Sequence, residues 1–178
     1  MYELTTGRPG PVWLSIPLNI QGMLVEDDIP PIITESLMQE MPDLKPIYNL
    51  LQSAKRPVLL IGNGIKLGNC QEKFCRFLEK YKIPVVCTWF STDLIQSEND
   101  LFGGKVGIYG DRTGNFIIQN ADLVVVIGSR FAIPQVGYDF SQLARDAKII
   151  IVDIDENEIN KYKDYFSQTY LQSCDVFI

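Results

Sequence analysis

The stretch that decides the fold reads Ala121-Asp122-Leu123-Val124-Val125-Val126-Ile127-Gly128-Ser129-Arg130-Phe131. Its centre, residues 123–127, holds five consecutive leucyl or β-branched side chains with no polar residue among them. A strand with one solvent-exposed face alternates apolar and polar residues, so this unbroken apolar run predicts a strand that is buried on both faces. Such strands are typical of parallel sheets with helices on either side. Gly128 ends the run, where the backbone can turn sharply or approach a ligand.

Working outward, the same kind of reasoning places further strands and helices on both sides of this run. Apolar β-branched stretches predict strands at 57–61, 83–88, 148–152 and, more briefly, 169–171. Helical spacing and turn signals predict helices at 43–55, with Asp43 as N-cap, around 74–81, at 111–120 and at 139–145. Residues 89–110 are predicted to form a long glycine-rich loop. The alternation predicts an α/β fold with a doubly wound, mostly parallel, Rossmann-like sheet of five to six strands and helices on both faces.

Length, composition and charge narrow the classes of function. With 178 residues, 46% of them hydrophobic and 21% charged, the chain has the composition of one soluble globular domain with an additional arm. The net charge of −6 and the lack of a basic cluster argue against nucleic acid as a partner. No apolar run reaches the roughly 20 residues that span a bilayer, and residues 1–6 lack a signal-peptide pattern. We therefore expect no membrane association and a cytoplasmic location.

The chain has four cysteines, Cys70, Cys75, Cys87 and Cys174, and no histidine. None of the cysteines form a CxxC pair, so we expect no metal site; reduced thiols are the main interpretation, with a disulfide as the alternative. The missing histidine removes the commonest general base and every Ser-His or Cys-His arrangement. The sequence therefore argues against acyl-transfer chemistry by this segment alone.

The two ends of the sequence do not resemble the ends of a compact domain. Residues 1–30 contain a turn-rich lead-in, a short apolar strand predicted at 12–17 and a linker that is acidic and proline-rich. This segment is either the closing strand and linker of a preceding domain or an arm that folds back on the domain formed by residues 31–178. At the other end, Ser173 resembles a helix N-cap only a few residues before Ile178. We expect a piece cut from a longer chain at both ends.

Glycine, hydroxyl or acidic side chains follow the predicted strands. In a parallel sheet they share one edge, where glycine N–H groups and arginine bind phosphate and carboxylates bind ribose. This pattern predicts a nucleotide crevice. Its candidate residues are Gly62, Asn63, Gly64, Thr88, Gly128, Ser129, Arg130, Asp153 and Asp155.

Each of these signals has a structural alternative. The spacing of Gly62, Gly64 and Gly68 has one residue too many for the dinucleotide fingerprint, and tight turns use glycine in the same way. The acidic pair after residues 148–152 could cap the next helix, and Arg130 could pair with a neighbouring carboxylate. The sequence alone leaves these alternatives open.

Five segments, taken together, resemble one known family. Residues 7–17 look like the segment that closes the pyrimidine-binding domain of thiamine-diphosphate enzymes of the acetolactate synthase group. Residues 56–64, 83–85, 121–131 and 148–159 resemble the central domain of that group, in the same order. The resemblance implies three domains in each subunit, and enzymes that decarboxylate or join 2-oxo acids through a thiamine-bound carbanion.

The resemblance also implies a cofactor position. Central domains of this group bind FAD in some members, ADP in others and nothing in many. Where FAD binds, the resemblance adds Gly107, Gly110 and Phe131 to the candidate residues above. Two departures weaken the flavin interpretation: Ile108-Tyr109-Gly110 stands where flavin binders commonly have Met-His-Gly, and residues 132–135 stand where they commonly have Asp-Asp-Arg.

Thiamine diphosphate and Mg²⁺ are implied for the parent enzyme and not for this segment. The glutamate that activates thiamine and the Gly-Asp-Gly magnesium motif belong to the other two domains of the group. The resemblance therefore predicts an inactive scaffold segment whose partners are the other domains of the same chain, within a homodimer or homotetramer. The alternative is a free-standing nucleotide-binding module of the NAD-binding type found in deacylases, which needs a catalytic histidine and a zinc ribbon that this sequence lacks.

Overall fold

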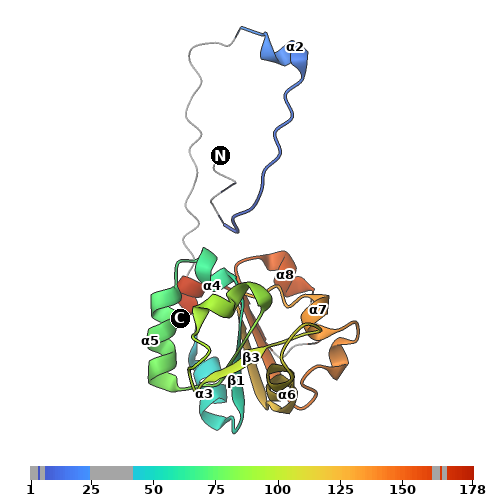
Figure 1. Ribbon diagram of the computed structural model, residues 1–178. Coiled ribbons are helices and arrows are strands. Elements are labelled where there is room, and N and C mark those ends of the chain that lie inside the picture. Colours follow the sequence, from blue (N-terminus) through green and yellow to red (C-terminus); the bar gives the residue numbers. More distant parts are fainter. Residues whose placement is uncertain (1–3, 5–6, 25–41, 162–164, 166–167) are drawn as a thin grey trace. The chain divides into compact units, whose positions relative to one another are not determined.

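The computed structural model describes residues 4, 7–24, 42–161, 165 and 168–178. The chain forms two compact units, Met1–Glu40 and Met41–Ile178. In the first unit, the described residues include the short helix α2 (Leu18–Gln21) (Figure 1). The strand predicted at 12–17 does not form there, because no described strand pairs with it, and the side chains of Trp13 and Leu14 are exposed. Most of the predicted linker lies outside the described residues.

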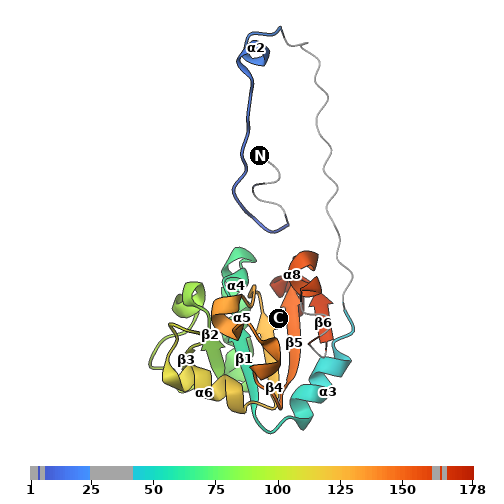
Figure 2. The same cartoon turned by 90° about the vertical axis from the view of Figure 1, so that its right-hand side faces the viewer.

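The second unit is built around a sheet of six parallel strands in its described part (Figure 2). The order across the sheet is β3-β2-β1-β4-β5-β6. The strands are β1 (Pro57–Ile61), β2 (Val85–Cys87), β3 (Phe102–Lys105), β4 (Leu123–Ile127), β5 (Lys148–Asp153) and β6 (Gln168–Leu171). This order is that of a doubly wound dinucleotide-binding fold, so the predicted fold class is confirmed.

Strand β4 lies at the centre of the sheet, as its unbroken apolar run predicts. Each of its residues is at most 2% exposed. Val125 is in register with Leu59 of β1 on one side and with Ile150 of β5 on the other. The order of the chain reverses between β1 and β4, so this pair of strands is the topological switch point of the sheet.

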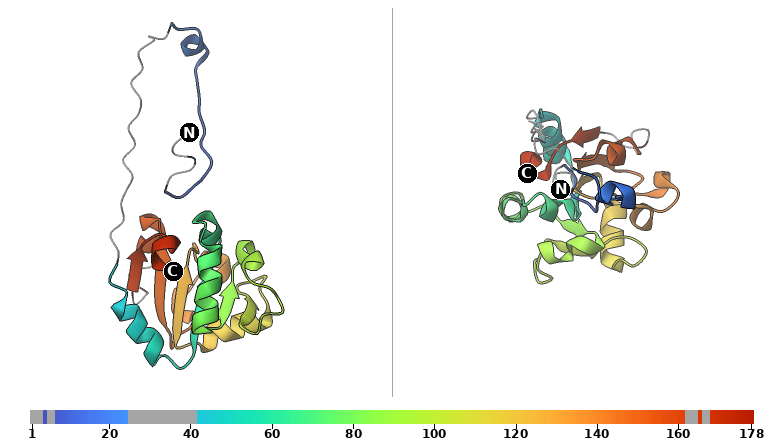
Figure 3. Two further views of the ribbon diagram at one scale, coloured as in Figure 1. Left: turned by 90° about the vertical axis from the view of Figure 1, so that its left-hand side faces the viewer. Right: turned by 90° about the horizontal axis from the view of Figure 1, so that it is seen from above.

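Helices cover both faces of the sheet (Figure 3). Side chains alternate along β1, so Leu59 packs in a core with α3 and α5, whereas Leu60 packs in a core with α6 and α7. The α-helices of this unit are α3 (Lys45–Ser53), α4 (Gly64–Leu67), α5 (Gln71–Tyr81), α6 (Arg112–Asn120), α7 (Ile133–Val136), α8 (Glu156–Asn160) and α9 (Cys174–Phe177). Two short 3₁₀ helices, Trp89–Leu94 and Phe140–Gln142, complete the set.

Three predictions of secondary structure in the second unit are wrong in detail. The loop predicted at 89–110 contains a 3₁₀ helix and strand β3, which pairs with β2 even though two of its four residues are glycine. The helix predicted at 139–145 is reduced to the 3₁₀ turn Phe140–Gln142, since Ala144 adopts a positive φ of 44° that no α-helix contains. Asp43 is not the N-cap of α3; that position is Leu44, although Asp43 Oδ1 accepts the N–H of Lys45 at 3.0 Å.

Candidate site at the carboxyl edge of the sheet

In the structure, the predicted site residues lie along one edge of the sheet. Each follows the carboxyl end of a strand, because all strand pairs are parallel. Residues 62–64 follow β1, Thr88 follows β2, residues 107–110 follow β3, residues 128–131 follow β4, and Asp155 follows β5, whose last residue is Asp153. Ligands of open α/β sheets bind at such an edge, close to the switch point. The contacts of each residue decide how much of the edge is available to a ligand.

The glycines of the β1 and β4 loops pack directly against each other. The N–H of Gly62 donates to the carbonyl of Ile127 at 2.9 Å, and the N–H of Gly64 donates to the carbonyl of Gly128 at 2.8 Å. A Cβ at Gly64 would lie 2.6 Å from the Cα of Gly128, and Gly128 itself has a positive φ of 59°. The close approach of two backbones therefore explains these glycines, which favours the tight-turn alternative over a phosphate cradle. Asn63, which lies between Gly62 and Gly64 in the sequence, is the N-cap of α4 and makes no side-chain capping hydrogen bond.

Ser129 and Phe131 belong to the turn and the core. The Oγ of Ser129 accepts the N–H of Phe131 at 3.2 Å. Phe131 has a φ of 50°, an uncommon value for a residue other than glycine, and its side chain is buried in the core with α6 and α7. The aromatic ring of Phe131 is thus a packing element rather than a stacking surface.

Arg130 forms an ion pair with a carboxylate that sequence reasoning did not single out. Its Nε lies 2.9 Å from Oε1 of Glu158 on α8, and Lys161 pairs with the same carboxylate. The side chain of Glu158 is 9% exposed, whereas that of Arg130 is 66% exposed. The paired alternative for Arg130 is therefore observed. A buried glutamate needs a partner, but nothing in the local sequence connects residue 158 with residue 130.

The two aspartates at the end of β5 accept hydrogen bonds from backbone N–H groups of the residues that follow them. Asp155 is the N-cap of α8, and its Oδ1 accepts the N–H of Asn157 at 2.9 Å. Asp153 is buried, and its Oδ1 accepts the N–H of Asp155 at 3.0 Å. The capping contact is thus present at Asp155, while Asp153 orders the turn before the helix.

Thr88 belongs to a buried hydroxyl pair with Ser91, a residue that sequence reasoning missed. The Oγ of Ser91 accepts the N–H of Thr88 at 3.1 Å and donates to the carbonyl of Ile61 at 2.8 Å. The two hydroxyl oxygens lie 3.0 Å apart. This pair ties the end of β2 to the end of β1, and only the pattern Thr-x-x-Ser at the start of the 3₁₀ helix hinted at it.

The loop after β3 is held by Asn115 of α6. The side chain of Asn115 accepts the N–H of Gly107 at 2.8 Å and donates to its carbonyl at 3.0 Å. Gly107 has a φ of 101°, and a Cβ there would lie 2.4 Å from the carbonyl oxygen of Pro134. Gly110 closes the turn by donating its N–H to the carbonyl of Gly107 at 2.9 Å. Both glycines are therefore required by the turn itself.

An aromatic pair lies beside this loop. The rings of Trp89 and Tyr109 have centroids 5.3 Å apart, and the side chain of Tyr109 is mostly exposed. The indole Nε1 of Trp89 is buried and has no hydrogen-bond partner within the described part of the chain. Among the predicted site residues and their neighbours at this edge, the Tyr109 ring and the Arg130 side chain are exposed, as are Phe90 and Ile108.

The thiols and acids of the described residues form neither a disulfide nor a group that could hold a metal ion. All four cysteines are free thiols. Burial raises the pKa of Cys87 to about 11 and that of Cys174 to about 12, which keeps both protonated near neutral pH. No group of three or more histidine, cysteine, aspartate or glutamate side chains among the described residues could hold a metal ion.

The strand order and the switch point define a doubly wound α/β domain of the nucleotide-binding type. The family described as "Thiamine pyrophosphate enzyme, central domain" matches residues 44–171, and the chain belongs to this family. The resemblance found in the sequence is thereby confirmed.

Curated relatives of the chain are acetolactate synthase large subunits. The chain is 34% identical to acetolactate synthase isozyme 1 large subunit of Escherichia coli over 161 residues, which cover 89% of this chain and 28% of that protein. It is 34% identical to a probable acetolactate synthase large subunit of Methanococcus aeolicus, covering 88% of this chain and 27% of that protein. For acetolactate synthase 2, chloroplastic, of Nicotiana tabacum, the identity is 32%, with 89% and 24% covered.

The chain thus spans about a quarter of the length of these relatives. A separate observation concerns membranes: none of the helices in the described part of the chain is long and apolar enough to cross one.

Proposed function

We propose that this chain is the scaffold domain of a thiamine-diphosphate-dependent enzyme that cleaves or forms carbon–carbon bonds on 2-oxo acids, as an acetolactate synthase does. Membership of the central-domain family and the similarity to acetolactate synthase large subunits support this proposal. The observation that carries the scaffold role is the packing of the carboxyl edge. A Cβ at Gly62 would lie 2.2 Å from the carbonyl oxygen of Gly128, so the loops are filled by their own backbone.

In the proposed parent enzyme, thiamine diphosphate with Mg²⁺ supplies the carbanion chemistry, and the domains that hold both lie outside this chain. The residues of this chain contribute a rigid body that fixes the distance between those domains. The contacts of Arg130 with Glu158 and of Ser91 with the carbonyl of Ile61 support that role, because they connect neighbouring strand ends to one another. The other domains of the same chain are the proposed partners, within a cytoplasmic homodimer or homotetramer.

The test uses the full-length protein and the 178-residue chain side by side. With pyruvate as substrate, the full-length protein should form product only when thiamine diphosphate and Mg²⁺ are supplied, and the 178-residue chain should form none. Turnover by the 178-residue chain alone would contradict the scaffold role. Absence of 2-oxo acid turnover in a full-length protein that binds thiamine diphosphate would contradict the proposed reaction. Light scattering of the full-length protein measures the number of subunits.

A second candidate function is the binding of an adenine nucleotide, FAD or ADP, on the outer side of the same edge. The switch point between β1 and β4 and the exposed ring of Tyr109 beside the buried Trp89 N–H favour it. The glycine loops fit it poorly, since the N–H groups of Gly62, Gly64 and Gly128 already donate to backbone carbonyls. If a nucleotide binds, the open groups Tyr109 and Arg130 must contact it.

Isothermal titration with FAD, ADP and NAD separates the remaining possibilities. If the nucleotide candidate is correct, Tyr109→Ala should weaken the binding of FAD or ADP at least tenfold, whereas Tyr81→Ala, at the far end of the sheet, should not. Binding of NAD but neither FAD nor ADP would favour the free-standing NAD-binding module. If a folded protein binds none of the three nucleotides, the scaffold role is the only one of these candidate functions that remains.

A further inference from the structure

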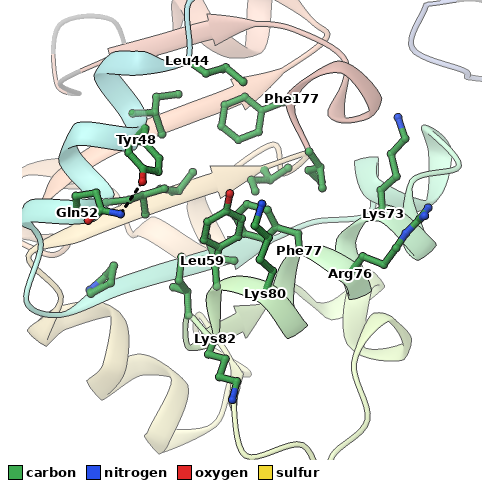
Figure 4. Close-up of a pocket in the computed structure, with 18 of the residues that line it drawn as sticks. Leu44, Tyr48, Gln52, Leu59, Lys73, Arg76, Phe77, Lys80, Lys82 and Phe177 are labelled. Atoms are coloured by element: carbon green, nitrogen blue, oxygen red, sulfur yellow. Dashed lines mark hydrogen bonds between the residues drawn. The ribbon is translucent and has the colours of Figure 1, made fainter.

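Two buried cysteines stand where helices α5 and α9 begin. Cys70 is the N-cap of α5, and Cys174 is the first residue of α9. The two residues are 1% and 6% exposed, and both belong to the same hydrophobic core. Both helices lie on one face of the sheet, where Lys73 of α5 and Phe177 of α9 line the same groove (Figure 4). The fold thus brings together two thiols from distant parts of the sequence.

The contacts of Gly68 and Gly128 place the two thiols next to each other. A Cβ at Gly68 would lie 2.9 Å from Sγ of Cys70 and 3.8 Å from Cβ of Cys174, so both cysteine side chains border the same small space. A Cβ at Gly128 would lie 2.9 Å from Sγ of Cys174. The two thiols also act directly on each other, since each is among the groups that shift the pKa of the other. They are therefore neighbours in the core.

Polar contacts hold the starts of the two helices together. Nζ of Lys73, in the first turn of α5, lies 2.5 Å from Oδ1 of Asp175 and donates to the carbonyl of the same residue at 2.9 Å. Ser173 caps α9, and its Oγ accepts the N–H of Asp175 at 3.3 Å. The residue after Cys174 is thus anchored to α5, which limits how far the two thiols can separate.

The two thiols differ in how readily they ionise. Burial and the Asp175 carboxylate raise the pKa of Cys70, although Lys73 opposes this rise. Burial, followed by the neighbouring Cys70, raises the pKa of Cys174 to about 12. Cys70 also stands at the N-terminus of an 11-residue helix, a position that favours a thiolate. Cys70 is therefore the thiol that reacts first, and it reacts slowly because burial keeps it mostly protonated.

We propose that Cys70 and Cys174 are an oxidation site, where a peroxide converts the two thiols into a disulfide that joins the start of α5 to the start of α9. The Cys70 thiolate attacks one oxygen of hydrogen peroxide, and the O–O bond breaks. The departing hydroxide takes up the Cys70 proton and leaves as water, so Cys70 becomes a sulfenic acid. The proposal does not depend on the enzymatic function.

The second step consumes the sulfenic acid. The Cys174 thiol attacks the Cys70 sulfur, the S–O bond breaks, and a second water leaves with the Cys174 proton. Two thiols are thus oxidised to one disulfide, and one peroxide is reduced to two waters. The oxidant must be small, because both thiols are buried.

The disulfide lies beside the contact between the β1 and β4 loops, since Sγ of Cys174 packs against Gly128. It closes a loop of about 100 residues, and a cross-link across a long loop strongly restricts the unfolded chain. The start of α9 should therefore open less often in the oxidised protein than in the reduced protein.

The test exposes the folded full-length protein to hydrogen peroxide, blocks the remaining thiols and analyses the peptides by mass spectrometry. Peptides joined through Cys70 and Cys174 should be at least tenfold more abundant than any joined pair that contains Cys75, and dithiothreitol should separate them. Hydrogen exchange of α9 should slow at least threefold on oxidation and recover on reduction. Cys174→Ala should abolish both effects. The matched control is Cys75→Ser, at the exposed cysteine of α5, which should retain both.

A second variant keeps the proposal testable if Cys174→Ala disturbs α9. Cys70→Ala removes the same bond from the other side and should also abolish the joined peptides. Sulfinic acid at Cys70 without joined peptides would overturn the proposal, because it would mean that Cys174 does not intercept the sulfenic acid. Oxidation confined to Cys75 would overturn it as well. Joined peptides with unchanged exchange of α9 would overturn the claim that the disulfide joins the two helix starts.

Discussion

The Cα of Gly62 lies against the carbonyl group of Gly128, so closely that a Cβ at residue 62 would lie 2.2 Å from the carbonyl oxygen. This contact joins the carboxyl ends of β1 and β4 at the switch point of the sheet. It has consequences for stability that substitutions can measure.

Substitution of either glycine with alanine should destabilise the domain. Gly62→Ala should lower the free energy of unfolding by about 1–3 kcal/mol, because the methyl group forces two backbones apart. Gly128→Ala adds a positive φ of 59° to a contact of 2.8 Å with the Cα of Gly64. Gly137→Ala is the matched control, since Gly137 has a φ of 81° but no atom within 4 Å of its expected Cβ. Urea titrations should show that Gly128→Ala costs more than Gly137→Ala; equal costs would mean that the contact contributes nothing.

Asp122, which precedes β4, should make stability depend on pH. Its two carboxylate oxygens accept the N–H groups of Lys55 at 2.7 Å and Arg56 at 2.8 Å. Burial pushes the pKa of Asp122 upward, but these backbone donors outweigh it, so the pKa lies below the ordinary value. The stabilisation is therefore complete above about pH 4 and is lost as the pH falls through the lower pKa of the folded state.

Asp122→Asn should consequently lower the free energy of unfolding by about 1 kcal/mol at pH 7, and by less at pH 3. Urea titrations at the two pH values measure the difference. Asp100→Asn, at an exposed loop position, should leave the stability unchanged at both. A difference between Asp122→Asn and the unsubstituted protein that stays constant from pH 7 to pH 3 would contradict the role of the carboxylate charge.

The pair Arg130–Glu158 should be energetically weak, because the arginine side chain is 66% exposed. A double-mutant cycle with Arg130→Gln and Glu158→Gln should give a coupling energy of about 0.5–1 kcal/mol at low salt. The coupling should decrease at 0.5 M salt because ions screen it. Arg145→Gln, at another exposed arginine, should show no coupling with Glu158→Gln. A coupling of zero at low salt would indicate that Arg130 is available to an anionic ligand instead.

The four thiols should differ sharply in reactivity. Cys75 is exposed, whereas Cys70, Cys87 and Cys174 are buried. Burial also raises the pKa of Cys70, as it does for Cys87 and Cys174, so few of these thiols ionise at pH 8. A thiol reagent at pH 8 should label one cysteine rapidly, and Cys75→Ser should abolish that fast phase. Mass spectrometry identifies the labelled residue, and rapid labelling of Cys174 would contradict the buried environment of α9.

The central strands could be predicted from sequence because their unbroken apolar runs are compatible only with strands that are buried on both faces. Residues 123–127 and 149–152 contain no polar residue, so they are suited only to positions that are covered on both faces. Strand β3 could not be predicted in the same way. Its sequence Phe-Gly-Gly-Lys has low strand propensity, and it forms because β2 offers free backbone groups next to it.

A proline and a local φ value explain why helix α7 was not predicted and why the helix predicted at 139–145 is wrong. Pro134 indicates a turn in sequence, yet in the structure it stands in the first turn of α7, where the missing N–H costs nothing. The positive φ of Ala144 ends the segment where a helix was predicted. Neither feature can be recognised without the tertiary contacts that impose it.

The position of the candidate site could be predicted, but its contacts could not. Parallel strands place Gly62, Gly128 and Asp153 at one edge, and this follows from the order of strands and helices alone. The partner of Arg130 lies 28 residues away on α8, and no local pattern specifies it. Whether a glycine faces a ligand or another glycine depends on the distance between two loops, which the sequence does not contain.

The interlocked loops at Gly62, Gly64 and Gly128 also have a mechanical consequence. They lie on the line where the order of the sheet reverses, with β1, β2 and β3 on one side and β4, β5 and β6 on the other. The sheet cannot bend along this line without separating two close-packed backbones. A force applied to the sheet at β3 therefore displaces β6 as well, because the six strands move together as one rigid body.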